Sequence, residues 1–232
     1  SVMAGEGTQN IVSVEGGQKL HALETSIPGD PSSAAFLIAG SLISPSGGVV
    51  VEGVMSNSTR DGFFQAASLM GAGLGAEEVG EGAGERLVDM QGESSTLRGC
   101  AVPEEIVASM IDEFPILAVL ASFASGETRV TGAEELRVKE SDRISAIVSM
   151  LRVNGVEVEE HEDGFTVQGC GGPPPGGGLV ETLHDHRIAM SALVMGTASQ
   201  KPVSIDDAAM IATSYPDFRA HMMELGADIR ET

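Results

Sequence analysis

The chain has 232 residues, of which 42% are hydrophobic and 20% charged, a composition that indicates a folded protein and excludes an intrinsically disordered one. Its formal net charge of −21 excludes nucleic acids and anionic membranes as partners, because a large negative field repels both. No apolar run reaches the roughly 18 residues of a membrane-spanning helix, and we expect no signal peptide from the first residues.

Residues 1–26 are predicted to be the end of a preceding N-terminal domain and the crossover from it. An extended run covers residues 10–14, Gly16 and Gly17 supply a turn, and a second extended run follows. This order predicts a hairpin. A C-terminal domain is expected over residues 27–232.

That domain is predicted to contain one pattern three times, over approximately residues 27–98, 99–169 and 179–232. In each copy an Asp precedes an apolar stretch, a strand-like stretch follows, and a second Asp lies near a Ser or Thr. The two Asp residues are 31, 30 and 32 positions apart in the three copies. Such agreement indicates structural repeats. The pairs are Asp30 with Asp61, Asp112 with Asp142, and Asp185 with Asp217.

Each copy is predicted to fold as a β-α-β-α-β-β unit. The first Asp is suited to cap a helix that is apolar almost all round and therefore buried, and Pro31 and Pro115 fit the first turn of such helices. In the middle copy a second helix ends near Asn154, and strands over residues 156–159 and 164–167 close the unit. The stripe of that second helix is Ile144, Ile147, Val148 and Leu151. The expected fold is α/β (α+β), with three sheets facing outward around buried helices.

The densest group of charged residues covers residues 137–143, at the expected start of a helix. Free backbone N–H groups and the helix dipole favour an anion there. Lys139, Glu140 and Arg143 are expected to share a helix face, since positions i and i+3 lie on one side. The alternative is a solvated charge run that pairs with itself.

Two further candidates also precede helices. Asp185, His186 and Arg187 are consecutive, and Asp112 precedes the apolar stretch of the middle copy. For each the alternative is a helix cap without chemistry. Together, helix N-termini and cations at equivalent places in three repeats predict a surface that binds multiply charged anions. We expect no metal and no cofactor, because the sequence has no phosphate-binding loop and no Cys/His metal spacing, and the glycines at 71–75 mark the end of a helix.

Four segments resemble the 5-enolpyruvylshikimate-3-phosphate synthase family. Their sequences are similar to those of its bacterial, glyphosate-tolerant class. The resemblance runs through nearly the whole chain, which looks like the C-terminal half of such an enzyme. It implies an inside-out α/β barrel of the enolpyruvyl transferase type, with the active site in a cleft between two domains. The segments are Pro28-Gly29-Asp30-Pro31-Ser32-Ser33, Met110-Ile111-Asp112-Glu113-Phe114-Pro115, Leu136-Arg137-Val138-Lys139-Glu140-Ser141-Asp142-Arg143 and Asp185-His186-Arg187-Ile188-Ala189-Met190.

The resemblance also implies a reaction and its residues. The family transfers the enolpyruvyl group of phosphoenolpyruvate to the 5-hydroxyl of shikimate-3-phosphate and releases phosphate. By this likeness Asp112 helps remove the hydroxyl proton and Lys139 stabilises charge beside it, while Glu140 supplies a proton to the methylene of phosphoenolpyruvate. Arg143 and Arg187 hold the anionic groups of phosphoenolpyruvate. His186 lies near the site.

Two departures from the family pattern limit the expected site. Thr213 stands where many members have a Lys. The N-terminal half of the enzyme, which supplies further contacts to both substrates, has no counterpart here, so we expect the chain alone to be inactive and the N-terminal half to be its partner.

Other functions remain open at this stage. UDP-N-acetylglucosamine enolpyruvyl transferase shares the fold and the chemistry, and a non-catalytic repeat domain that binds an anion or a partner chain is a different class of function. Cys100 and Cys170 form no Cys-x-x-Cys pair, which favours reduced thiols and a cytoplasmic protein.

Overall fold

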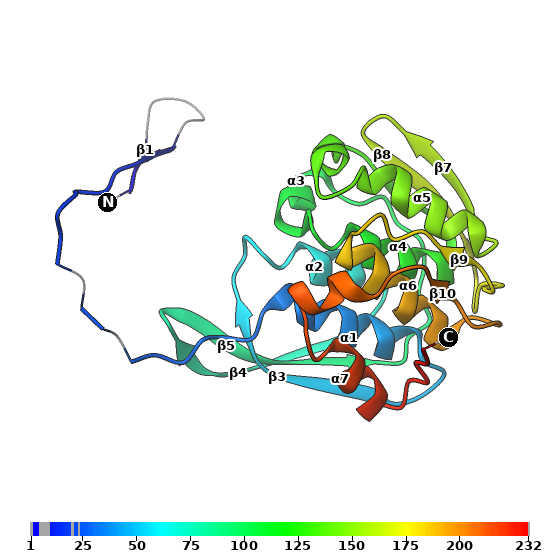
Figure 1. Cartoon of the computed structure of the whole chain (residues 1–232), viewed down its shortest axis with the longest axis horizontal. Helices are drawn as coiled ribbons and strands as arrows, with labels where there is room; N and C mark the ends of the chain where they lie inside the picture. The colour runs from blue at the N-terminus through cyan, green and yellow to red at the C-terminus, as the bar shows by residue number, and fades with distance from the viewer. Residues whose placement is uncertain (1, 5–9, 20, 23, 232) are drawn as a thin grey trace.

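The computed structural model describes residues 2–4, 10–19, 21–22 and 24–231. Helices lie at the centre, and the strands form separate small sheets around them (Figure 1). The expectation of a mixed α/β fold with several outward-facing sheets is thus confirmed.

The N-terminal hairpin differs from the prediction. β1 (Val2–Ala4) pairs antiparallel with β2 (Asn10–Val12), so the partner of β2 precedes it in the chain. Gly16 and Gly17 form a turn as predicted, but no strand follows them among the described residues up to position 28; positions 20 and 23 of the expected second run lie outside that description. The stretch after Gly17 lacks the period-two alternation of a strand, which accounts for the error. In Figure 1 the hairpin lies apart from the helices.

The first repeat forms a complete unit. Asp30 caps its central helix by accepting a hydrogen bond from Ser33 N at 2.9 Å, and Pro31 fills the first helical position. Ala83 and Gly84 join the last two strands with φ of 52° and 82°, a two-residue turn of type I′. The strands form an antiparallel sheet in the order β3-β5-β4. The elements are α1 (Pro31–Ile43), β3 (Gly48–Ser56), α2 (Gly62–Leu69), β4 (Gly73–Gly82) and β5 (Glu85–Glu93).

The second repeat has the same order of elements. Its sheet is antiparallel in the order β6-β8-β7, and the second helix carries the expected apolar stripe and ends at Val153, with Asn154 as its C-cap. One expectation is wrong: the central helix begins two residues after Asp112, Glu113 takes the N-cap position, and Asp112 lies in the preceding turn and caps nothing. The elements are α3 (Glu104–Val107), η1 (Ala108–Met110), α4 (Phe114–Phe123), β6 (Ser125–Val130), η2 (Glu134–Val138), α5 (Arg143–Val153), β7 (Glu157–His161) and β8 (Gly164–Cys170).

The third repeat is incomplete in the part of the chain that the structure describes. β9 and β10 pair in parallel, as residues 29 and 54 do in the first repeat. After the last helix, residues 225–231 pair with no strand in this described part, so the closing hairpin of the other units is missing. The elements are β9 (Leu179–Val180), α6 (His186–Ala198), β10 (Ser204–Ile205), η3 (Ala209–Thr213) and α7 (Phe218–Glu224).

The central helices of the three repeats, α1, α4 and α6, pack against one another and form the core. All ten residues of α4 are buried, as its uniformly apolar sequence predicts. Phe114 of α4 meets Phe165 of β8 edge-on at 6.4 Å between ring centroids, and Phe36 of α1 meets Phe218 of α7 at 6.1 Å. These contacts fix the central helices against the surrounding elements, and so fix the groups at their ends.

The edge strands β4 and β7 carry exposed acids. Glu77, Glu78 and Glu81 on β4 and Glu157 and Glu159 on β7 are all exposed. In the described part of the chain, no single helix has both the length and the apolarity to span a membrane; one pair bent by 119°, Glu104–Met110 with Phe114–Phe123, passes only when taken together.

Candidate functional site

The N-termini of α1, α4, α5 and α6 meet at one surface, and polar side chains from all four join across it. Arg143 at the start of α5 binds Asp185, the N-cap of α6. Arg187 on α6 binds Glu113, the N-cap of α4, and Ser32 on α1 hydrogen-bonds Glu113. The predicted convergence of helix N-termini is therefore confirmed. The helix dipoles place partial positive charge at this surface, where the cations Arg143, Lys139 and Arg187 are paired with carboxylates.

Arg143 is the most engaged cation of the site. Its side chain is 0% exposed, and its three nitrogens donate to three carboxylates: Nε to Asp185 Oδ2 at 2.8 Å, Nη1 to Asp112 Oδ1 at 2.8 Å, and Nη2 to Glu140 Oε2 at 2.5 Å. Asp185 is equally buried. Burial by itself would raise the pKa of Asp185, but the hydrogen bond and charge of Arg143 outweigh it and hold that pKa below its usual range. Arg143 thus organises the carboxylates around itself.

Asp112 lies at the centre of the cations. Besides Arg143, the Nζ of Lys139 is 3.8 Å from its Oδ1 and the Nη2 of Arg187 is 3.5 Å from its Oδ2. Burial raises the pKa of Asp112, but Arg187, Arg143 and Lys139 together lower it below the ordinary value. In this state Asp112 is an ionised carboxylate and a weak base.

Arg187 has a different environment from Arg143. Its Nη1 donates to the carbonyl of Asp112 at 3.2 Å and to Glu113 Oε1 at 3.3 Å. Among the described residues, none accepts a hydrogen bond from the side-chain Nε or Nη2, although Nη2 forms an ion pair with Asp112 Oδ2 at 3.5 Å. An anion that takes these two donors therefore competes with Asp112. His186 precedes Arg187 on α6; burial, and next the charge of Arg187, lower the pKa of His186 and favour the neutral imidazole.

The loop before α5 brings Lys139 and Glu140 to the site, but not by the expected helical spacing. Both residues lie between η2 and α5, outside either helix, so the argument from a shared helix face was wrong. Glu140 still reaches Arg143, and its side chain is half-exposed at 50%. Arg137 does form the self-paired arrangement given as the alternative, with Asp142 at 2.9 Å and Glu160 at 3.1 Å.

The sequence missed several members of this cluster. Glu113 was given no role of its own, and Asp185 was a candidate beside His186 and Arg187 with a helix cap as the alternative; in the structure it caps α6 and also binds Arg143. Ser32 and Arg60 come from the first repeat, where Arg60 Nη2 binds Ser32 Oγ at 2.8 Å and Asp30 Oδ1 at 3.2 Å. A signal existed: these positions lie in the matched Asp segments of the repeats.

The backbone before Asp185 is strained. Leu183 and His184 both take left-handed φ values, 53° and 58°, which cost free energy in non-glycine residues. Thr182 anchors this turn by donating its N–H and Oγ to Asp206 Oδ1 at 2.9 and 2.7 Å. The strained backbone of Leu183 and His184 is therefore held on one side by the bonds of Thr182 to Asp206 and on the other by the contacts of Asp185.

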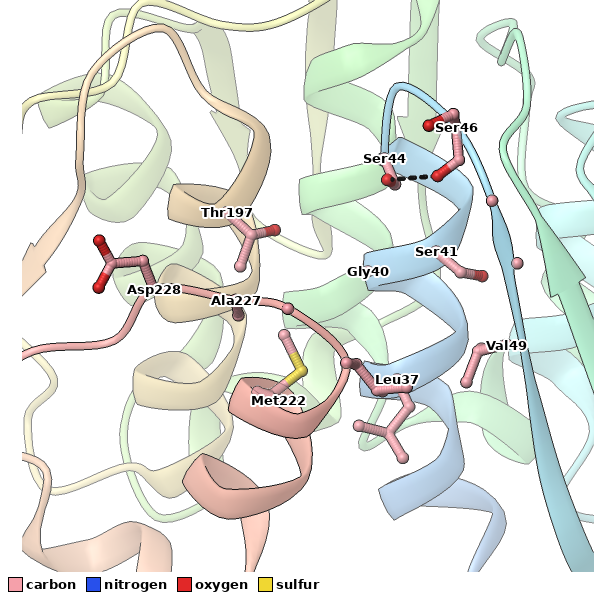
Figure 2. A pocket seen from close by; sticks show the side chains of 14 residues that line it. Leu37, Gly40, Ser41, Ser44, Ser46, Val49, Thr197, Met222, Ala227 and Asp228 are labelled. Atoms are coloured by element: carbon pink, nitrogen blue, oxygen red, sulfur yellow. Dashed lines mark hydrogen bonds between the residues drawn. The ribbon is translucent and has the colours of Figure 1, made fainter.

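Two hollows lie beside the C-terminal segment. One, of about 420 Å³, is lined by α1, α7 and residues around Asp228 (Figure 2). The other, of about 450 Å³, lies between α6, β10 and residues 228–230. Neither is lined by the charged side chains of the helix N-termini. Among the described residues, no three His, Cys, Asp or Glu side chains are placed to hold a metal ion.

Comparison with known proteins agrees with this geometry. The sequence model of the family described as EPSP synthase (3-phosphoshikimate 1-carboxyvinyltransferase) matches residues 2–222. This chain belongs to the EPSP synthase family. A 3-phosphoshikimate 1-carboxyvinyltransferase of Hyphomonas neptunium is 74% identical over 94% of the chain, and one of Granulibacter bethesdensis is 50% identical over 97%. The matched regions cover 50% and 49% of those relatives, so the chain spans about half the length of the curated relatives it matches.

Solved structures show the fold of this family. An EPSP synthase from Acinetobacter baumannii matches with a TM-score of 0.87 and 38% identity, over 94% of this chain and 52% of that one. The enolpyruvyl transferase NikO from Streptomyces tendae matches with a TM-score of 0.63 at 18% identity. This match shows a shared fold and nothing about function. The chain therefore has the enolpyruvyl transferase fold.

Proposed function

We propose that this chain is the C-terminal half of a synthase that transfers the enolpyruvyl group of phosphoenolpyruvate to the 5-hydroxyl of shikimate-3-phosphate and releases phosphate. One observation carries the proposal. Arg143, Lys139 and Arg187 converge on Asp112 in a strongly acidic protein, and among the described residues the Nε and Nη2 of Arg187 have no hydrogen-bond acceptor. Such a site suits a reaction in which an anion is held beside a carboxylate that moves a proton.

Anion binding is assigned first to Arg187. A carboxylate or phosphate can take its Nε and Nη2 donors together, in the bidentate geometry that arginine favours. Arg143 can contribute only if Glu140 or Asp112 releases it, and Asp185 then remains as its buried partner. We therefore expect phosphoenolpyruvate to displace Glu140 from Arg143.

That displacement also suits the proton transfers. Released from Arg143, the half-exposed Glu140 takes a proton from solvent and, as the carboxylic acid, delivers it to the methylene carbon of phosphoenolpyruvate while the 5-hydroxyl oxygen bonds to its C2. Asp112 accepts the hydroxyl proton. An anion on Arg187 offsets a charge that lowers the pKa of Asp112, so substrate binding makes Asp112 a stronger base. Lys139 stabilises the charge beside it, and His186 stands at the rim as a neutral neighbour. The carboxylate of Glu140 then takes a proton back from the methyl carbon as phosphate leaves C2, which restores the enol ether.

Within its described residues, the third repeat lacks a strand that the other half of the enzyme could supply. In the first two sheets, the middle strands β5 and β8 each lie between a strand that follows the central helix and a strand that follows the second helix. In the third repeat β10 follows the central helix, no strand follows α7 among the described residues, and β10 and residues 228–230 line the 450 Å³ hollow. We propose that an extended segment of the rest of the enzyme fills it, with residues 1–26 as the crossover and residues 27–232 as the C-terminal domain of three repeats.

The alternatives have less support. The matching family and the two relatives above bear the shikimate name, which favours it over UDP-N-acetylglucosamine enolpyruvyl transferase. A non-catalytic anion-binding module has no need of an ionised carboxylate among the cations. The proposal includes the cytoplasm as compartment, since Cys100 and Cys170 are both free thiols.

The test is phosphate release from phosphoenolpyruvate and shikimate-3-phosphate. The chain alone should show none, and the chain fused to the N-terminal half of the Hyphomonas relative should turn over. Losing several donors to phosphoenolpyruvate and shikimate-3-phosphate costs more than the roughly 10²–10³-fold of losing one. Robust turnover by the chain alone would overturn the shared-site proposal, and a well-folded fusion without turnover would overturn the function.

A further inference from the structure

Glu113 is a buried carboxylate for which the proposed mechanism has no use. It is 4% exposed, and with Asp185 it makes up the buried carboxylates of the described residues. We propose that Glu113 is a positioning residue that fixes the guanidinium of Arg187 so that its Nε and Nη2 edge faces the anion. This inference rests on the proposed function, because it assigns Arg187 to phosphoenolpyruvate.

Helix capping does not explain the residue. Glu113 occupies the N-cap position of α4 with φ −99° and ψ 1°, but its side chain makes no capping hydrogen bond. Its Oε1 instead accepts from Arg187 Nη1, which belongs to the third repeat. Burying the Glu113 carboxylate costs free energy, and the contact that this buried group makes is with Arg187 rather than with the backbone of its own helix.

The donor geometry of Arg187 shows what this contact achieves. Nη1 carries two hydrogens, and Glu113 Oε1 and the carbonyl of Asp112 accept them. Both acceptors belong to the turn before α4, so the Nη1 end is held from one side. The Nε hydrogen and one Nη2 hydrogen lie on the edge that these two acceptors do not occupy, although Nη2 is also 3.5 Å from Asp112 Oδ2. This is the edge that a bidentate oxyanion would take.

Glu113 is itself held by the first repeat. Burial raises its pKa, while a hydrogen bond from Ser32 and the charge of Arg187 act in the opposite direction. Ser32 in turn accepts a hydrogen bond from Arg60 at 2.8 Å. A connected set of contacts therefore runs from α1 through Glu113 to Arg187, and it joins the three central helices at their N-termini.

Without Glu113 the structure offers Arg187 a competing partner. Its Nη2 already forms an ion pair with Asp112 Oδ2 at 3.5 Å, and a small rotation would shorten this contact into a direct hydrogen bond. That rotation would turn the Nε and Nη2 edge onto Asp112 and take it from the anion. Loss of Glu113 should therefore weaken the binding of phosphoenolpyruvate more than that of shikimate-3-phosphate.

The experiment uses the fusion of this chain to the N-terminal half of the Hyphomonas relative. Glu113→Ala should raise the KM for phosphoenolpyruvate on the order of tenfold to a hundredfold, the scale of one charge-assisted hydrogen bond, and change the KM for shikimate-3-phosphate less than threefold. Glu113→Gln keeps an acceptor oxygen at the same place and should recover most of the loss. Glu105→Ala, an exposed acid on α3, is the matched control and should change neither constant.

A merely structural role would give a different pattern. Equal losses in Glu113→Ala and Glu113→Gln, or a lower melting temperature with both KM values unchanged, would overturn the inference. A fusion that does not turn over at all refutes the proposed function instead. The inference is then decided on the isolated chain, by titrating inorganic phosphate against the Arg187 Nε–H resonance: Glu113→Ala should weaken binding at least tenfold and Glu113→Gln less than threefold, and equal affinities would refute it.

Discussion

Replacing Asp185 by Asn should destabilise the folded chain far more than the same replacement of an exposed Asp that also pairs with an Arg. The change removes a charge that is 2.8 Å from Arg143 Nε, and both side chains are 0% exposed. Breaking a buried ion pair costs about 3–5 kcal/mol when the remaining charge is left without compensation. Asp112 and Glu140 still bind Arg143, and the Asn oxygen still accepts hydrogen bonds, so we expect the lower end, about 3 kcal/mol.

The sign of the pH dependence follows from the pKa of Asp185. Because Arg143 lowers this pKa in the folded state, the stability that Asp185 contributes is present above the ordinary Asp pKa of about 4 and is lost as the pH falls below it. Asn does not titrate, so the gap between wild type and variant should close in acid.

Urea unfolding followed by circular dichroism, between pH 7 and pH 3, measures both effects. A loss of about 3 kcal/mol lowers the melting temperature by roughly 6–12 °C in a chain of this size. Asp228→Asn is the control, because Asp228 pairs with Arg230 on the surface and should be indistinguishable from wild type. A variant within 1 kcal/mol of wild type at pH 7, on the order of one weak hydrogen bond, or a gap that widens in acid, would refute the reasoning.

Three further predictions concern other parts of the molecule. In the fused enzyme Arg187→Ala should lower turnover by roughly 10²–10³, the cost of one preorganised donor, and a drop below threefold would remove Arg187 from the site. Glu140→Gln should depress kcat far more than it raises either KM; intact turnover with weaker binding would make Glu140 a binding residue instead. Ala83→Asn should raise the free energy of unfolding by about 0.5–1 kcal/mol, because Asn tolerates the left-handed φ of 52° better than Ala, and equal or lower stability in urea would contradict the type I′ assignment.

The repeats were predictable because their signal is local. Matched Asp residues, apolar stretches and glycine turns each depend on a few neighbouring positions, and the structure confirms α1, α4, α5 and α6 from them. The β1–β2 hairpin was mispredicted because a short extended run can pair with either neighbour, and nothing in its own residues decides which.

The site was predictable only in part, for a related reason. Sequence alone identified Asp112 and Arg187, but the bond from Arg187 to Glu113 joins residues 74 positions apart, and Arg143 binds Asp185 over 42 positions. Such pairs depend on how the helices pack, and no periodicity within one segment encodes them. Resemblance supplied roles for Lys139 and Glu140, whereas the three-carboxylate environment of Arg143 needed the three-dimensional arrangement.

The exposed acids of the edge strands β4 and β7 have a kinetic consequence. An anion that approaches the protein first meets a body of charge −21 and only at short range the cations at the helix N-termini. At an ionic strength of 0.01 M the repulsion extends about 30 Å from the surface, whereas at 0.15 M it is confined to about 8 Å. Moderate salt should therefore speed the capture of an anionic ligand, because it screens the distant carboxylates more than the partly buried arginines. Only at higher concentrations, where the salt's own anions compete for Arg187, should capture slow again.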